Sequence, residues 1–107
     1  MSKYNRVRMT PEQRKLQILD AAVGVALDQG VYAFSIANVS RAIQDRHCSK
    51  ATIKHYFSTM ENLRTAVIEK AIKDDHGVIV AQAIAMNHDA VNSLDSGQRR
   101  KYLKCAL

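Results

Sequence analysis

Side chains of the kind that contact DNA bases and phosphates are concentrated between Ser49 and Phe57, in the segment SKATIKHYF. A helix here has only two large apolar residues at helical spacing, Ile53 and Phe57, the i and i+4 pair expected to face a core. At about 100° per residue, Ala51 and His55 then point away from that core. A short helix with little core and a polar outer face favours insertion into a partner. On a basic chain, the first candidate partner is a DNA major groove.

The polar residues of this segment divide by their chemistry. Thr52 and His55 can form hydrogen bonds with base edges, and the small Ala51 allows close approach to a base or a thymine methyl group. The groups suited to phosphate are at Ser49, Lys50, Lys54 and Tyr56. The alternative is an ordinary surface helix with solvated polar side chains, and spacing alone leaves both interpretations open.

No other grouping in the sequence predicts chemistry of its own. His47, Cys48 and His55 suggest a metal site at first, but the first two point apart at a helix start and no fourth ligand has suitable spacing. We therefore expect Cys48 in a small buried position and no metal. No nucleophile–base arrangement, phosphate-cradling glycine loop or carboxylate pair is present, so we expect neither an enzyme nor a cofactor.

Length and charge indicate one small domain with a basic front half. The chain has 107 residues and a net charge of +6. Residues 1–60 hold nine Lys and Arg against four Asp and Glu, whereas residues 61–107 hold seven against six. This asymmetry favours a polyanion partner for the front half, although simple solubility explains it equally well. Two distant cysteines, no signal peptide and no long apolar run predict a cytoplasmic protein without a membrane partner.

The residue pattern predicts an all-α chain, a small bundle of about five or six helices. A basic arm, residues 1–9, is followed by a helix-turn-helix region, residues 10–63, and by C-terminal helices, residues 64–107, packed with it as one domain. Thr10 begins the first helix and Gly30 ends it. The next helices are expected at 35–43, 49–57 and from about 60, with a last one at about 96–105. Residues 61–88 form either one helix or two, because Gly77 can interrupt them.

Two apolar stripes are expected to bury these helices. The first helix has its main stripe at Leu16, Leu19, Val23, Ala26 and Leu27, widened by Ile18 and Ala22. Farther along, apolar residues that recur every seven positions, with two neighbours, predict a dimerisation surface at Ile68, Ile72, Ile79, Ala83 and Met86. The alternative is that this second stripe packs only within one chain.

Residues 14–63 resemble the DNA-binding domain of tetracycline-repressor-type (TetR family) transcriptional regulators. The matching residues are Arg14, Ile18, Leu19, Ala21, Ala22, Gly30, Phe34, Ser35, Ile36, Val39, Ser49, Lys50, Ala51, Thr52, Ile53, Tyr56, Phe57, Glu61 and Leu63. The resemblance implies that the helix around residues 49–57 lies in the major groove. It further implies that Ser35 and the start of the fourth helix contact phosphates, and that the protein acts as a dimer.

The chain departs from that family in three ways. The turn before Ser49 is about three residues longer than usual and contains no glycine. Lys54 stands where an aromatic residue is expected, and Met60 stands where a phosphate-contacting lysine is common. About 44 residues follow Leu63, which is too few to enclose a drug-sized pocket in one subunit, so we expect no small-molecule ligand.

Together these features predict a sequence-specific double-stranded DNA-binding regulator, a dimeric repressor of a palindromic operator. Its signal would be its own concentration or a protein partner. Further contacts are expected from the arm, at Lys3, Arg6 and Arg8, and from the polar turn, at Arg46. The alternative is a helical protein–protein interaction module that does not bind DNA itself.

Overall fold

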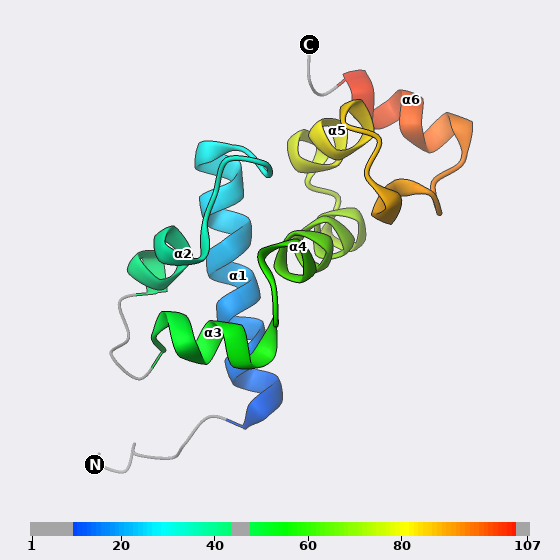
Figure 1. Cartoon of the computed structure of the whole chain (residues 1–107). Helices are drawn as coiled ribbons and strands as arrows, with labels where there is room; N and C mark the ends of the chain where they lie inside the picture. The colour runs from blue at the N-terminus through cyan, green and yellow to red at the C-terminus, as the bar shows by residue number, and fades with distance from the viewer. Residues whose placement is uncertain (1–9, 44–47, 105–107) are drawn as a thin grey trace, which may run out of the picture.

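A computed structural model describes residues 10–43 and 48–104, and all the regular structure in these ranges is helical. The helices are α1 (Pro11–Gln29), α2 (Ile36–Ile43), α3 (Lys50–Tyr56), α4 (Met60–Asp74), α5 (Gly77–Ala85), the short 3-10 helix η1 (Asp89–Val91) and α6 (Ser96–Lys104). In Figure 1, α2 lies against the long α1, α3 follows beside α2, and α4 leads from α3 to α5 and α6 at the other end. The predicted all-α bundle of five or six helices is confirmed.

The start of α1 is stabilised by a reciprocal cap. The Thr10 Oγ1 accepts a hydrogen bond from the backbone N–H of Gln13 at 3.1 Å, and the Gln13 Oε1 accepts one from the Thr10 N–H at 2.9 Å. Pro11 occupies the first helical position, where its missing N–H costs nothing. At the other end, Gly30 has φ of 96°, a left-handed conformation that favours glycine. Both predicted ends of α1 are therefore confirmed.

The buried side of α1 is rotated from the stripe expected. The buried residues are Ile18, Ala22, Val23, Val25 and Ala26. By contrast, Leu16 and Leu27 are 49% and 47% exposed, so the prediction that these two leucines belong to the core was wrong. The cause is that α1 is contacted by α2, α4 and α5, which cover a different arc of the helix.

Residues 61–88 form two helices, because the chain turns sharply at Asp75. This residue has φ of 63°, and the backbone N–H of His76 donates to the Ala71 oxygen at 2.8 Å, which closes the end of α4. The carboxylate of Asp75 also accepts hydrogen bonds from the Tyr102 hydroxyl at 2.7 Å and from the Lys101 ammonium at 3.3 Å. The last helix is therefore held to the α4–α5 turn.

Most residues of the predicted dimerisation stripe are buried within the single chain. Ile68, Ile79 and Ala83 are completely buried within the single chain, and Ile72 is half-buried. Only Met86 is well exposed, at 62%. The repeat of seven residues spans the break between α4 and α5, so it does not mark one continuous helix face. These three residues belong to the buried core of the single chain, so the prediction that they lie on a dimerisation surface was wrong.

The described residues were also searched for helices that could span a membrane and for groups of side chains that could bind a metal ion. None of their helices has the length and apolar character needed to cross a membrane. Within the same ranges, no group of three or more His, Cys, Asp and Glu side chains is arranged to hold a metal ion.

Candidate nucleic-acid interface

The helix α3 is anchored by a few buried side chains. Ile53 is completely buried and Phe57, at its C-terminal cap, is 5% exposed, so the predicted inward pair is confirmed. Cys48, just before the helix, is also buried, as expected. The Ser40 hydroxyl of α2 lies 3.5 Å from the backbone oxygen of Cys48, to which it can donate. These contacts hold α3 against α2, while Ala51, Lys54 and His55 of the helix remain exposed.

Ser49 caps the first turn of α3. Its backbone is extended, with φ of −82° and ψ of 177°, and its Oγ accepts a hydrogen bond from the Thr52 N–H at 3.3 Å. The two hydroxyl oxygens of Ser49 and Thr52 lie 3.4 Å apart. The cap satisfies a donor that would otherwise lack a partner at the helix start. It also brings both hydroxyls to one end of α3.

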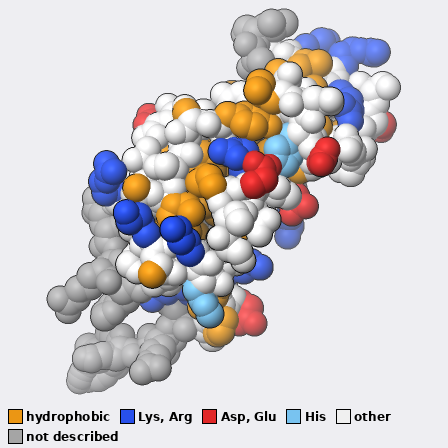
Figure 2. Space-filling model, in the orientation of Figure 1, with side chains coloured by type: hydrophobic (Ala, Val, Ile, Leu, Met, Phe, Trp, Pro, Cys, Tyr) orange, Lys and Arg blue, Asp and Glu red, His pale blue; other side chains and the backbone are white. Residues whose placement is uncertain are grey.

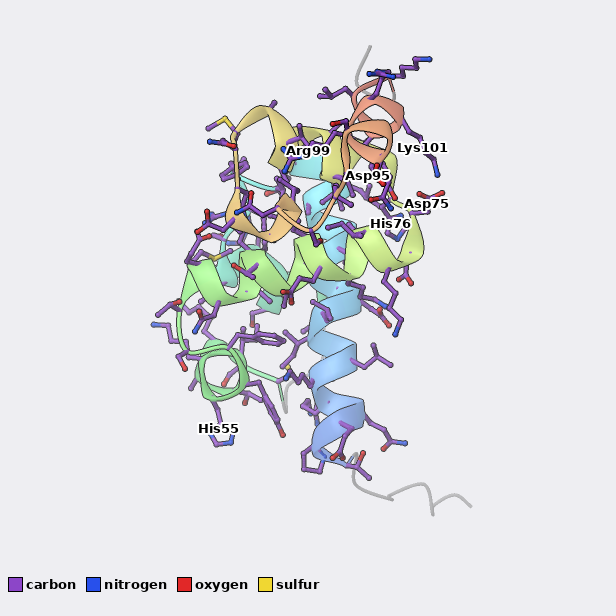
Figure 3. All side chains as sticks on the ribbon, turned by 90° about the vertical axis from the view of Figure 1, so that its right-hand side faces the viewer. His55, Asp75, His76, Asp95, Arg99 and Lys101 are labelled. Carbon is purple, nitrogen blue, oxygen red and sulfur yellow. The ribbon has the colours of Figure 1, made fainter. Side chains whose placement is uncertain are left out.

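The outward side of α3 carries the residues that the sequence indicated. Ala51 and His55 are exposed, opposite the buried Ile53. The half-buried Thr52 and Tyr56 lie along one flank of this exposed strip, and the exposed Lys54 lies on the other. The rings of His55 and Tyr56 meet edge to face, with centroids 5.0 Å apart. In Figure 3, the His55 side chain points away from the body of the protein at the outer side of α3.

The charge of this region is positive. α2 and α3 together contain Arg41, Lys50 and Lys54, all exposed, and neither helix contains an acidic residue. Figure 2 shows Lys and Arg side chains on the lower left of the molecule, over α2 and α3, with a histidine below them. Exposed cations around a polar helix face suit contact with a phosphate backbone.

Ser35 caps α2 and is only partly exposed. Its Oγ accepts the N–H of Asn38 at 3.2 Å, and the Asn38 side-chain amide donates to the Gln29 Oε1 at 2.7 Å. The second bond joins the start of α2 to the last turn of α1. Ser35 is thus placed beside the α1–α2 junction, at the end of α2 opposite Ile43.

The start of α4 differs from the phosphate-binding end implied by the resemblance. Thr59 caps it by accepting the Asn62 N–H at 3.0 Å, but Met60 is half-buried and packs on the core. Nearby, the Lys15 ammonium lies 5.6 Å from the centre of the Phe57 ring. This cation–π contact places a lysine of α1 beside the C-terminal end of α3.

Arg64 is a structural residue that the sequence analysis missed. Its Nε donates to the backbone oxygen of Val31 at 2.9 Å, and its guanidinium lies 5.2 Å from the Tyr32 ring centre. The Val31 N–H in turn donates to the Gln82 Oε1 at 2.9 Å. The segment before α2 is therefore held by both α4 and α5. The Glu61–Arg64 pair at i, i+3 was visible in the sequence, but nothing there indicated Val31.

Glu61 of α4 connects Arg64 to His88, the residue that caps η1. Its carboxylate lies 2.6 Å from Arg64 Nη1 and 2.6 Å from His88 Nε2. The His88 Nδ1 accepts a hydrogen bond from the Ala90 N–H at 3.0 Å, so in this arrangement the Nε2 carries the proton and donates a hydrogen bond to Glu61. Burial alone would raise the pKa of Glu61, but the hydrogen bonds from His88 and Arg64 outweigh it and hold that pKa below its usual value.

The structure thus brings Ser49, Lys50, Ala51, Thr52, Lys54, His55 and Tyr56 together on and around one helix. Ser35 belongs to the other end of α2. The predicted contacts Lys3, Arg6, Arg8 and Arg46 lie outside the described residues. Comparison of the chain with protein-family models, with curated proteins and with solved structures found no match.

Proposed function

We propose that this protein is a sequence-specific regulator that binds double-stranded DNA, with α3 in the major groove. The main observation behind this proposal is that α3 has few buried residues and a largely exposed outer side. One completely buried residue within the helix, Ile53, and the adjacent Phe57 anchor it, while its outer side is exposed and polar. A major groove accepts an α-helix, and its base edges present donors and acceptors to such a side. The resemblance of residues 14–63 to TetR-type regulators supports the same assignment.

The side chains of α3 would then divide between bases and phosphates. Ala51, Thr52 and His55 would face base edges, because they lie on or beside the side opposite Ile53. The exposed Lys50 and Lys54, which lie on the same flank of α3, would pair with phosphates along one side of the groove. Tyr56, Ser49 and Ser35 would add hydroxyl contacts, since a capping serine that accepts an N–H still has a proton to donate.

Regulation through a palindromic operator would follow if two copies bind together. Two α3 helices related by a two-fold axis would enter the groove about one DNA turn apart. We propose that such a dimer represses by blocking promoter access, without a small-molecule inducer. The arm residues Lys3, Arg6 and Arg8, and Arg46 of the turn, would strengthen binding through phosphate or minor-groove contacts.

Binding to a fluorescent duplex of mixed sequence tests the DNA contact before any operator is known. Affinity should fall steeply as salt rises, because each protein–phosphate contact releases counterions. The double variant Lys50→Ala/Lys54→Ala should reduce the slope of log K against log salt by about 2. The control Arg100→Ala/Lys104→Ala removes two exposed positive charges of α6 and should keep the slope. Parent protein that shows no salt-dependent binding would contradict the proposal.

A protein–protein interaction module that does not touch DNA is the second candidate. The observation that favours it is the exposed apolar character of α5, where Val78 is 44% exposed and the following Met86 is 62% exposed. Such surfaces are typical of protein contacts. The salt titration separates the two candidates, because an apolar contact weakens little with ionic strength.

A further inference from the structure

The side chain of His88, which caps η1, is 8% exposed and has both ring nitrogens engaged. Its Nδ1 accepts a hydrogen bond from the Ala90 N–H at 3.0 Å, and its Nε2 lies 2.6 Å from the Glu61 carboxylate. An amide N–H only donates, and an ionised carboxylate only accepts. These two partners therefore fix the neutral ring with its proton on Nε2. The proposed DNA contacts make no use of this side chain.

Charged and titratable groups reach η1 and its cap from several parts of the fold. They are Glu61 and Arg64 of α4, Tyr32 before α2, Asp89 of η1 itself and Arg99 of α6. The helix α5, which also contacts η1, contains no charged side chain. Glu61 favours a positive charge on the His88 ring, whereas Arg64, which pairs with the same carboxylate, opposes it. The Ala90 N–H also opposes this charge, because its bond is made only to the neutral ring.

Protonation of His88 would break one of its two bonds and keep the other. The added proton would sit on Nδ1 and point at the Ala90 N–H, so that two donors would face each other where the nitrogens are now 3.0 Å apart. The Nε2 would still donate to Glu61, and the positive charge would strengthen that bond. The ring would stay with Glu61, and the first turn of η1 would lose its cap.

We infer that His88 is a pH-sensitive switch that holds the start of η1 closed when neutral and opens it when protonated. Histidine is the side chain whose charge ordinarily changes between about pH 8 and about pH 5. Burial raises the pKa of Glu61, but the hydrogen bonds from His88 and Arg64 hold it below its usual value, so Glu61 stays ionised over that range. The inference requires no DNA.

The part of the chain that the switch would move is the link from α5 to α6. The backbone oxygen of Val91, the last residue of η1, accepts hydrogen bonds from the Leu94 N–H at 3.0 Å and from Arg99 Nη2 at 3.0 Å. Arg99 belongs to α6. A shift at the start of η1 is therefore passed on to the segment that positions the last helix.

Nuclear magnetic resonance of the isotope-labelled full chain, at a series of values from about pH 8 to about pH 5, tests the switch. The ring nitrogen shifts of His88 report its protonation, and the Ala90 amide reports the capping bond. The protection factor of the Ala90 amide against hydrogen exchange should fall at least about threefold as the ring becomes charged, as expected for the loss of one hydrogen bond.

His88→Asn removes the titrating ring and keeps a side-chain oxygen of the kind that caps helices. Its Ala90 amide should have the same protection factor at both ends of the pH range. The matched control is His76→Asn. His76 is also an N-terminal cap, of α5, but its side chain makes no capping bond. This control should keep the pH response of the parent at Ala90. Circular dichroism confirms that both variants remain helical.

Each outcome decides the inference. A loss of Ala90 protection that follows the His88 titration, is absent from His88→Asn and persists in His76→Asn supports it. A His88 ring that stays neutral down to about pH 5, or an Ala90 amide that stays equally protected once the ring is charged, overturns it. A pH response that persists in His88→Asn also overturns it, because a different group would then be the one that titrates.

Discussion

The Arg64 Nε donates a hydrogen bond to the Val31 backbone oxygen at 2.9 Å, across 33 positions of the sequence. Arg64 belongs to α4, and Val31 lies in the segment that leads into α2. The Arg64 side chain is only 14% exposed, and its guanidinium also lies 5.9 Å from the Phe34 ring centre. This arginine therefore fixes the C-terminal helices to the part of the chain that positions α2 and α3.

Loss of that arginine should destabilise the fold. Arg64→Met removes the donor to Val31 and leaves a partly buried carbonyl without its partner, which should cost about 1 to 3 kcal/mol in the free energy of unfolding. Urea unfolding followed by circular dichroism measures the change. Arg100→Met, on the exposed side of α6, is the control and should stay within about 0.5 kcal/mol. If both variants unfold like the parent, Arg64 does not have the structural role described.

The anchoring of α3 can be tested in its core. Ile53→Ala leaves a cavity where a completely buried side chain stood, and should lower the free energy of unfolding by about 2 to 5 kcal/mol. Leu103→Ala removes an equally apolar side chain from an exposed position of α6 and should change stability by less than about 0.5 kcal/mol. Chemical unfolding of the two variants gives the comparison. A stable Ile53→Ala protein would mean that α3 does not pack through this residue.

The Asp75–Tyr102 contact predicts a specific pH dependence. The hydrogen bond from the Tyr102 hydroxyl, followed by that from Lys101, lowers the pKa of Asp75 in the folded protein. A lowered folded-state pKa stabilises the fold above the ordinary pKa of the carboxyl, and this stabilisation is lost as pH falls through the lowered value. The acid limb of the parent's stability curve should therefore include a contribution from Asp75.

Asp75→Asn isolates that contribution. Asparagine tolerates the left-handed backbone of this position but does not titrate. The variant should be less stable than the parent at neutral pH, and the difference should shrink as pH falls through the acidic range. Thermal unfolding at a series of pH values shows this directly. A difference that is the same at every pH would contradict the assignment of the shift to Asp75.

Base and phosphate contacts should respond differently to substitution once a binding site is known. His55→Ala and Thr52→Ala should each lose about 1 to 3 kcal/mol of discrimination at particular base pairs. Lys54→Ala should weaken binding to all sequences alike and reduce the salt slope by about 1. Anisotropy titrations on the site and on single-base variants separate the two patterns. Uniform loss for His55→Ala would place that residue against phosphate rather than a base.

Local features of this fold were predictable from the sequence, whereas features that depend on packing were not. The Thr10 cap, the Gly30 stop and the inward Ile53–Phe57 pair all depend on residues within a few positions of one another. In contrast, α1 is apolar over a wide arc, so its pattern cannot decide whether Leu16 or Val25 is buried. That choice is made by α2, α4 and α5, which pack on one side of α1.

The prediction of a dimerisation surface was wrong because it also depended on how the helices pack. A repeat of seven residues indicates a single face only while the helix continues, and the left-handed residue Asp75 ends α4 inside the repeat. Ile79 then points into the core, and Met86 remains exposed. For the candidate interface, the residues of α3 could be predicted from their spacing. The Arg64–Val31 and Gln82–Val31 contacts could not, because they join distant segments.

Selection of bound sites from a pool of random double-stranded DNA tests whether α3 recognises DNA. Recognition by a dimer should enrich one sequence family, a palindrome with half-sites about one DNA turn apart. The same selection with a Thr52→Ala/His55→Ala variant should lose or alter that enrichment, because these side chains face the bases. A parent protein that enriches no sequence, or a variant that enriches the same sequence equally well, would contradict recognition of DNA by α3.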